Sequence, residues 1–265
     1  MAKKKAGTPV LSLIIPAYKK EKIIVPNVRQ IKKVLDKIRY KYEIIVVVDG
    51  IIDKTFQKLK SAHIPNVRAF AYKKNQGKSF AIRLGMHKAK GEYIMFLDSG
   101  MEIDPNGISM LLEHMEWYEA DIVVGSKRHP ASYVEYAFSR KILSLTYYYL
   151  VKILFGVAVK DTQAGIKVFR RHVTEKVLPR LVEKRFAGDL EILVVARQLG
   201  FKRVFEAPIR LDYNLGDVTS AATMRAIRGI LVDTLAIFYR AYILRYYKRH
   251  RQRFTLPKGM KIEQL

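Results

Sequence analysis

Short apolar runs alternate with helically periodic stretches through the first half of the chain. Residues 43–48 (EIIVVV) are apolar after the first position and rich in β-branched side chains, which is typical of a strand buried on both faces. Residues 22–39 instead repeat their apolar side chains at helical spacing. The pattern predicts strands over 10–15, 43–48, 67–72, 93–97 and 121–124, and helices over 22–39, 54–62, 77–89 and 105–118. This alternation predicts an α/β fold with a mostly parallel sheet flanked by helices.

The second half of the chain is less regular. We expect helices over 136–155, 173–181, 189–199 and 225–247, and short strands over 166–169 and 203–205. The last helix carries one apolar stripe, formed by Leu231, Leu235, Phe238 and Tyr242, and places Asp233 and Arg240 on the opposite side. The predicted organisation is one α/β domain over 8–224, followed by an amphipathic helix and a basic tail over 225–265.

The chain is strongly basic, with 49 Lys and Arg against 24 Asp and Glu in 265 residues and a formal charge of +25. This charge calls for an anionic partner, which is nucleic acid, an anionic membrane surface or a phosphorylated substrate. The basic residues are spread along the chain and no nucleic-acid-binding motif is evident, so we expect no nucleic acid. The absence of Cys excludes disulfides, iron–sulfur clusters, Cys-bound zinc and a thiol nucleophile.

Two stretches, 142–159 and 226–247, are apolar enough to require comparison with membrane spans. Both are interrupted by polar or charged side chains, whereas a spanning helix needs roughly 20 predominantly apolar residues. The N-terminus carries lysines and no secretory apolar segment. We therefore expect no signal peptide, no transmembrane helix, and a last helix that lies with its basic tail on an anionic membrane surface. The alternative for this helix is a core or oligomer contact, and the oligomeric state is left open.

Candidate chemistry follows from the predicted sheet. In such sheets ligands bind at the carboxyl ends of the strands, so the side chains that directly follow each strand are the first candidates. These positions are 16–18, 49, 73–78, 98–102 and 125–128. They contain carboxylates, lysines and a glycine turn.

The segments around these positions form an ordered set of motifs. They are SLIIPAY (12–18), EIIVVVDGIIDKT (43–55), NQGKSFAIRLGMHKAKGEYIMFLD (75–98), DIVVGSKR (121–128), RKILS (140–144), DTQAGIKVFRR (161–171) and GDLEILVVARQLG (188–200). With these motifs the chain resembles family 2 inverting glycosyltransferases of the GT-A fold, and within them the polyprenyl- and dolichyl-phosphate hexose synthases. The resemblance implies transfer of glucose or mannose from a nucleoside diphosphate sugar to a polyprenyl (dolichyl-type) phosphate, with inversion, at the cytoplasmic face of a membrane.

The resemblance implies a donor site and names its residues. They are Pro16, Ala17, Tyr18, Glu21, Asp49, Gly77, Lys78, Asp98 and Ser99. Gly77 and Lys78 belong to a turn that enters a helix, where backbone N–H groups and the lysine charge favour a phosphate. Asp49 is expected to accept a hydrogen bond from the base or ribose. The alternatives are a turn-capping role for Asp49 and an ordinary loop position for Lys78.

A divalent cation, Mg²⁺ or Mn²⁺, is also implied. The family holds it with a D-x-D motif, of which Asp98 is the first carboxylate, but Gly100 replaces the second. Glu102 is the expected substitute, so the predicted metal ligands are Asp98 and Glu102. The alternative is metal-independent or impaired catalysis, and Val48 and Lys20 are further departures from the family pattern.

The acceptor phosphate is expected to bind a second set of residues. The resemblance assigns this role to Ser126, Lys127, Arg128, Arg140, Ser144 and Gln163. The alternative is a solvated basic helix end. Asp189 joins Asp98 as a candidate catalytic residue, either as the base that removes a proton from a hydroxyl acceptor or as a group that orients the sugar or metal. Asp189 could equally cap the helix over 189–199. A glycan or protein hydroxyl acceptor, and a catalytically weakened homologue, remain as alternative functions.

Overall fold

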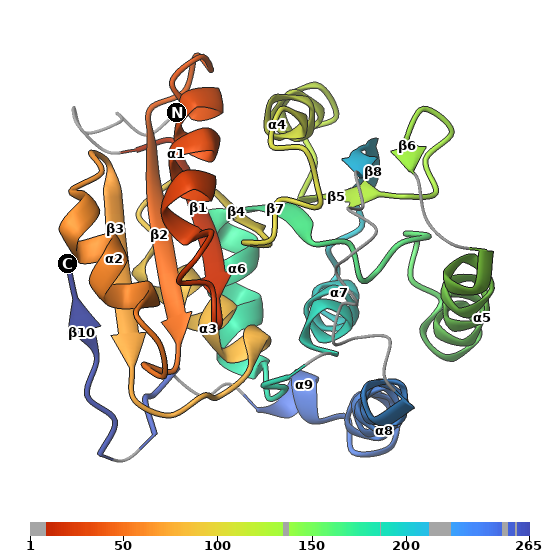
Figure 1. Ribbon diagram of the computed structural model, residues 1–265. Helices are drawn as coiled ribbons and strands as arrows, with labels where there is room; N and C mark the ends of the chain where they lie inside the picture. Colours follow the sequence, from red (N-terminus) through yellow and green to blue (C-terminus); the bar gives the residue numbers. More distant parts are fainter. Residues whose placement is uncertain (1–8, 135–137, 186, 212–223, 251–253, 258) are drawn as a thin grey trace.

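An eight-stranded sheet forms the centre of the molecule (Figure 1). The computed structural model describes residues 9–134, 138–185, 187–211, 224–250, 254–257 and 259–265. The strand order is β10-β3-β2-β1-β4-β7-β5-β8. The strands are β1 (Leu11–Ala17), β2 (Tyr42–Asp49), β3 (Val67–Tyr72), β4 (Tyr93–Leu97), β5 (Ile122–Ser126), β7 (Ile166–Arg170), β8 (Val204–Pro208) and β10 (Glu263–Gln264). The predicted α/β fold with a mostly parallel sheet is confirmed.

Two strands run against the others. β7 lies between β4 and β5 and is antiparallel to both. β10, near the C-terminal end of the chain, pairs antiparallel with β3 and covers that edge of the sheet. The pattern predicted a strand at β7 but not its position or direction, because these depend on pairing with strands far away in the sequence. A small second sheet of β6 (Tyr133–Val134) and β9 (Arg210–Leu211) was not predicted.

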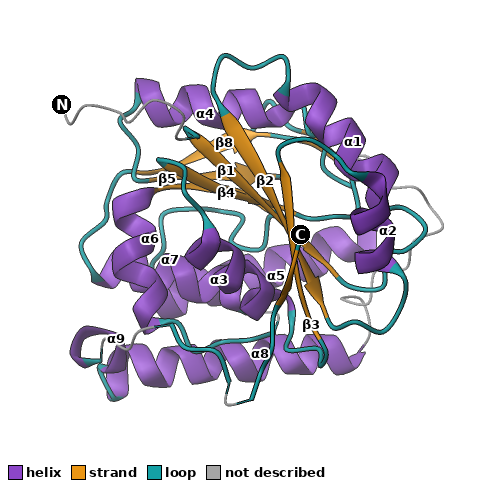
Figure 2. Ribbon diagram, turned by 90° about the vertical axis from the view of Figure 1, so that its left-hand side faces the viewer, coloured by secondary structure: helices purple, strands orange, loops and turns teal. Residues whose placement is uncertain are grey.

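Helices cover both faces of the sheet (Figure 2). They are α1 (Ile24–Leu35), α2 (Thr55–Ala62), α3 (Lys78–Lys88), α4 (Gly107–Trp117), α5 (Phe138–Phe155), α6 (Arg171–Val177), η1 (Leu178–Arg180), α7 (Gly188–Gln198), α8 (Met224–Phe238) and α9 (Tyr246–Arg249). α1, α2 and α4 share one buried cluster with the sheet, and α3, α5, α6, α7 and α8 share the other.

The central strand β2 shows why its sequence is apolar without interruption. Ile45 and Val47 point into the cluster that contains α3 and α7, whereas Ile44, Val46 and Val48 point into the cluster that contains α1 and α4. Successive side chains of a strand alternate between faces, and here both faces are buried. The register pairs this strand with β1 and β3 so that their carboxyl ends meet at one edge of the sheet.

The single helix expected over 225–247 is interrupted. α8 ends at Phe238, a π-helical turn follows at Tyr239–Ile243, and Arg245 has φ +51° before α9 begins. Ile237 and Tyr247 are completely buried in the cluster that contains α7, so this segment packs on the core of the domain. The wider turn lets the chain keep contact with that core while it changes direction. In the part of the chain that the structure describes, no helix is both long and apolar enough to cross a bilayer.

Candidate active site

The predicted site residues converge on the carboxyl edge of the sheet. Asp49 ends β2, Asp98 follows β4, and Ser126 ends β5. Lys78 begins α3 and Asp189 lies in the first turn of α7. Segments that are more than 100 residues apart in the sequence therefore meet here, as ion pairs between them show directly.

A chain of alternating charges forms the centre of the site. The ammonium of Lys78 lies 2.8 Å from Asp98 Oδ1 and 3.4 Å from Asp189 Oδ2. The other oxygen of Asp189, Oδ1, lies 3.2 Å from the ammonium of Lys167, which also donates to the carbonyl of Ala164 at 2.7 Å. The Lys167 side chain is completely buried, whereas the Asp98 side chain is 43% exposed. The chain of charges thus leads from the core to solvent.

Burial and charge act against each other on these groups. Burial alone would raise the pKa of Asp189, but the neighbouring charges of Lys167 and Lys78 outweigh it and lower that pKa. Burial would lower the pKa of Lys78, and the Asp189 and Asp98 carboxylates reverse this and raise it. Burial and the neighbouring Lys78 charge lower the pKa of Lys167, and the Asp189 and Asp161 carboxylates offset this only in part. A carboxylate with a lysine on each oxygen and a lowered pKa is a weak general base.

Two glycines allow this close approach. A Cβ on Gly165 would lie 2.4 Å from Asp98 Oδ2, so a side chain there would displace the Asp98 carboxylate. Gly77 has φ +101°, and a Cβ on it would lie 2.3 Å from the carbonyl oxygen of Lys184. The turn that carries Lys78 is therefore pressed directly against the segment before α7.

The Asp49 carboxylate holds the turn that leads into Lys78. Its carboxylate accepts hydrogen bonds from the Tyr72 hydroxyl (2.8 Å), the Asn75 side chain (2.8 Å), and the backbone N–H groups of Gln76 (2.7 Å) and Gly77 (2.9 Å). The side chain is almost completely buried. Asp49 therefore holds the distant turn at 75–77, which differs from the expected alternative of a local cap on the turn before Gly50, and hydrogen bonding of Asp49 to a nucleotide stays a prediction.

The predicted donor residues at the end of β1 and in the loop after it lie at the border of the site. Pro16 and Ala17 pair with β2 at the end of β1, and the Tyr18 ring is 43% exposed just beyond them. The Glu21 carboxylate accepts the backbone N–H of Lys54 at 3.0 Å, so it ties this loop to the start of α2. Their contact with a donor nucleotide stays a prediction.

The predicted metal ligands face one small pocket. Asp98 and Glu102 line a cavity of about 70 Å³ together with Lys127 and Gln163. A Cβ on Gly100 would lie 3.8 Å from Glu102 Oε1, so the Glu102 side chain folds back toward the position where the family carries its second Asp. No group of three or more His, Cys, Asp or Glu side chains suited to a metal occurs among the described residues. Asp98 and Glu102 are the carboxylates that line this pocket among the described residues, and Asp98 also holds Lys78.

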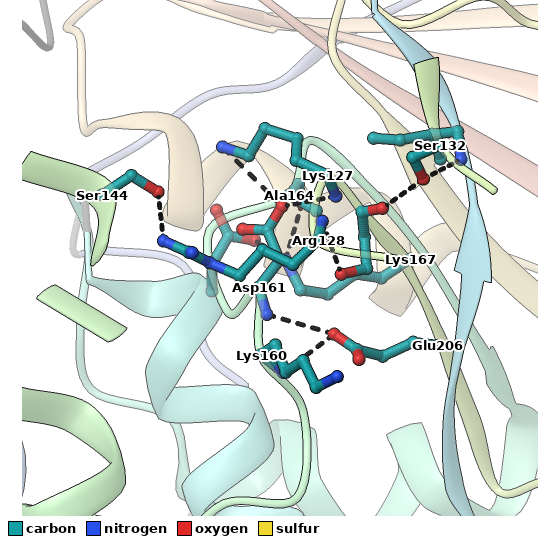
Figure 3. Close-up of polar contacts among 12 residues, drawn as sticks. Lys127, Arg128, Ser132, Ser144, Lys160, Asp161, Ala164, Lys167 and Glu206 are labelled. Atoms are coloured by element: carbon teal, nitrogen blue, oxygen red, sulfur yellow. Dashed lines mark hydrogen bonds and ion pairs between the residues drawn. The ribbon is translucent and has the colours of Figure 1, made fainter. Parts of the chain in front are cut away.

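Three of the residues expected to bind the acceptor phosphate, Lys127, Arg128 and Ser144, form what we call the acceptor cluster (Figure 3). Arg128 points toward α5 and donates to the Ser144 hydroxyl at 2.9 Å, with its guanidinium over the Tyr148 ring at 5.3 Å. The ammonium of Lys127 lies 3.7 Å from Asp161, which also accepts the Lys127 backbone N–H. Asp161 therefore holds the loop that carries these two basic residues in place.

The remaining acceptor residues have different positions. Gln163 lines the small pocket and donates to the Tyr147 hydroxyl at 3.4 Å. The Ser126 side chain is completely buried and accepts the backbone N–H of Arg128, so it shapes the loop. The side chain of Arg140 lies outside the described residues.

Sequence reasoning missed two contributors to the site. Lys167 is a charged side chain in the interior of strand 166–170 (IKVFR), between Ile166 and Val168, and that position was the signal that could have identified it. Asn27 of α1 donates to the carbonyl oxygen of Ser99 at 2.8 Å and so positions the turn after Asp98. No local pattern indicated this second contact.

The fold and this edge of charged side chains define a GT-A type protein. A crystal structure of glucosyl-3-phosphoglycerate synthase from Mycobacterium tuberculosis in complex with UDP shares the fold, with a TM-score of 0.66 over 88% of this chain and 81% of that one, at 14% identity. A further structure of that synthase holds Mn²⁺, UDP and phosphoglyceric acid. The model of glycosyl transferase family 2 matches residues 12–178, so the chain belongs to this family.

Curated relatives agree with the family. A dolichyl-phosphate beta-glucosyltransferase of Dictyostelium discoideum is 32% identical over 206 residues, which are 71% of this chain and 62% of that protein. The human dolichyl-phosphate beta-glucosyltransferase is 29% identical over 72% of this chain and 64% of its own length. The chain thus spans less than two thirds of the length of these relatives.

Replacing Lys167 tests the chain of charges. We expect Lys167→Met to lower the free energy of unfolding by about 3–5 kcal/mol at pH 7, because it leaves the buried Asp189 with one counter-ion at a longer distance. Urea denaturation measures this change. The same substitution in an Asp189→Asn background should cost clearly less. Equal costs in the two backgrounds would show that the two charges are not coupled.

Proposed function

We propose that this chain transfers a hexosyl group from a nucleoside diphosphate sugar to a polyprenyl (dolichyl-type) phosphate. The observation that supports the proposal most strongly is that both carboxylate oxygens of Asp189 are paired with lysines. A hydroxyl acceptor needs a base, whereas a phosphate monoester is largely dianionic at pH 7 and is already a nucleophile. Asp189, with its lowered pKa and with both oxygens on lysines, suits an acceptor that needs no base. The names of the relatives support the same acceptor.

The reaction is a single displacement at the anomeric carbon. An acceptor phosphate oxygen forms a bond to this carbon while the bond from the carbon to the diphosphate oxygen breaks. The electron pair of that bond leaves with the nucleoside diphosphate, and attack from the opposite side inverts the configuration. No proton has to be removed from the acceptor. The protein contributes by placing the two anions in line and by stabilising the charge that develops on the leaving group.

Two groups of cations serve the two phosphate groups. Lys78, in the turn at the start of α3, stabilises the diphosphate, and Lys127 and Arg128 hold the acceptor phosphate. Mg²⁺ or Mn²⁺ is the proposed cofactor, with Asp98 and Glu102 as its protein ligands, since Mg²⁺ is commonly held by one or two carboxylates plus substrate phosphates. When bound, the ion supplies further neutralisation of the leaving group.

An exposed apolar surface next to the acceptor cluster suits a lipid. One stripe lies on α5, where four exposed apolar side chains follow one another at helical spacing: Ile142, Leu145, Tyr149 and Ile153. A second stripe lies on the neighbouring α8 and the turn after it, and its exposed side chains are Leu231, Leu235, Tyr239 and Tyr242. We call these two stripes the α5/α8 apolar surface. The two helices touch through Phe155 and Phe238. The helix that carries Ser144 of the acceptor cluster therefore also carries apolar side chains for the bilayer.

The proposed location is peripheral, on the membrane face that the nucleotide sugar reaches. Exposed cations on the same helices, Lys152 and Arg228, favour anionic headgroups. Of the sequence-predicted stripe, Leu231, Leu235 and Tyr242 are exposed as this location requires, whereas Phe238 is partly buried against α5.

Sugar transfer to a short polyprenyl phosphate in detergent tests the proposed function. With Mg²⁺ or Mn²⁺ present, we expect transfer from UDP-glucose or GDP-mannose, and a fall in kcat/KM of about 10²–10³-fold for Lys78→Met, because a positioned charge is lost. Lys74→Met is the matched control, since Lys74 is an exposed lysine of the same loop. Absence of transfer by the unmodified chain from these and other common donors would refute the proposal.

The pH dependence separates a phosphate acceptor from a hydroxyl acceptor. With polyprenyl phosphate we expect kcat/KM to rise through about pH 6, where the phosphate becomes dianionic, in the unmodified chain and in Asp189→Asn alike. Asp189→Asn should be slower, because Lys78 loses a counter-ion, but its profile should keep the same shape. Transfer to a glycan hydroxyl that Asp189→Asn abolishes would instead support the alternative function with Asp189 as base.

Vesicle sedimentation tests the proposed membrane surface. Ile153→Glu combined with Leu235→Glu should weaken binding to phosphatidylserine-containing vesicles at least tenfold, since burying one such side chain is worth about 1.5–3 kcal/mol. Both side chains are highly exposed, so the thermal stability should not change. Trp117→Glu, which alters an exposed aromatic residue of α4 on the other face of the sheet, is the control. Equal binding by all variants would refute this surface.

A further inference from the structure

The described residues between η1 and α7, 181–185 and 187, lie between the Lys78 turn and the C-terminal helices. On the side of the turn, the backbone N–H of Phe80 donates to the carbonyl of Lys184 at 3.2 Å, and the Ser79 hydroxyl donates to the carbonyl of Arg185 at 2.5 Å. A Cβ on Gly188 would lie 2.1 Å from Ser79 Oγ. No space separates the two segments, so a shift of one must move the other.

On its other side the same segment is held by Arg240. One guanidinium nitrogen of Arg240 pairs with Glu183, and the other lies 3.3 Å from Glu191 Oε1. Glu191, completely buried in α7, also accepts the backbone N–H of Glu183 at 2.9 Å and the Tyr247 hydroxyl at 2.8 Å. Arg240 thus joins two buried carboxylates, one from the segment and one from α7.

A second residue of the same helical stretch acts on the same segment. The backbone N–H of Ala187 acts on the Asp233 carboxyl and lowers its pKa, against the larger effect of burial, which raises it. Asp233 and Arg240 are seven residues apart, or about two helical turns, so both face the segment. The opposite side of this stretch carries the exposed Leu235 and Tyr239 of the α5/α8 apolar surface.

We infer that Arg240, in the π-helical turn after α8, is a positioning residue. It fixes the turn that carries Lys78, which we call the donor turn because Lys78 is proposed to bind the donor diphosphate. Arg240 holds Glu183, the 182–185 backbone holds Ser79 and Phe80, and this fixes Lys78 between its two carboxylates. The inference rests on the proposed function, because it gives Lys78 the donor diphosphate as its ligand. It adds that the helix with the membrane-facing stripe also determines how well the donor site is ordered.

The charges of Glu183 and Glu191 explain why the loss of Arg240 would affect the turn that carries Lys78. Without it, the carboxylates of Glu183 and Glu191 face each other with few counter-charges in a buried environment, and burial already raises the pKa of Glu191. The Glu183 side chain must then turn toward solvent, and the backbone that carries it is the backbone packed on the donor turn. Lys in place of Arg keeps the charge but not the fork that reaches two carboxylates at once.

Calorimetry of UDP binding and hydrogen exchange test this inference on the full chain. We expect Arg240→Ala to weaken UDP at least tenfold and to speed amide exchange in peptides that cover residues 76–82, with Arg240→Lys between it and the unmodified chain. Arg68→Ala is the matched control, because Arg68 also forms a partly buried ion pair, with Glu43 at 2.8 Å, at the opposite end of the strands. It should lower stability without either effect.

The outcomes separate the two proposals. If the unmodified chain binds UDP and Arg240→Ala binds it equally well, or if Arg68→Ala weakens UDP as much, the positioning role is wrong and the proposed function stands. If the unmodified chain binds neither UDP nor GDP, the donor site fails and the positioning role fails with it. Unchanged exchange over 76–82 in Arg240→Ala would also overturn the inference, whatever the affinity.

Discussion

A carboxylate held between two lysines is the interaction on which the rest of the site depends. Asp189 is almost completely buried, and a buried charge persists only if it is paired and hydrogen-bonded. Its two oxygens fix two ammonium groups, Lys167 in the core and Lys78 at the edge of the sheet. Lys78 in turn holds Asp98, which is partly open to solvent. The position of every charge in this row depends on the one before it, and this order lets a basic protein present a defined cation to an anionic ligand.

The sheet provides the geometry that this row needs. Parallel strands bring their carboxyl ends to one edge, and the antiparallel insertion of β7 between β4 and β5 adds Lys167 and Gly165 from a distant segment. Gly165 leaves room for the Asp98 carboxylate, and the strand that follows carries Lys167 beneath Asp189. After α8, Arg240 pairs with Glu183, in the segment that packs on the start of α3. Core, site and outer apolar surface are therefore parts of one packed unit.

Much of the site could be found from the sequence because its residues follow strands. Lys78 and Asp98 were predicted by their positions after strands and by resemblance, Asp189 was predicted by resemblance alone, and the structure joins the three by ion pairs. Arg128 and Ser144 were each predicted by resemblance as acceptor-phosphate residues, and the structure joins them by a hydrogen bond. What remained open was how each group is used. A position after a strand indicates that a carboxylate is near a ligand, but it does not say whether backbone N–H groups already occupy its oxygens, as they do at Asp49.

The sequence by itself determined the fold class, the edge of the sheet where the site lies and most of the side chains that reach it. Hydrophobic period and residue order carry this information locally, because a strand or helix is recognised within some ten residues. Only the tertiary structure decided the place of β7, the interruption after Phe238, and the pairing of Lys167 and Arg240 with carboxylates elsewhere in the chain. Those features depend on which distant groups meet in a desolvated interior. No local pattern specifies that meeting, because the free energy of a buried charge is set by its neighbours in space.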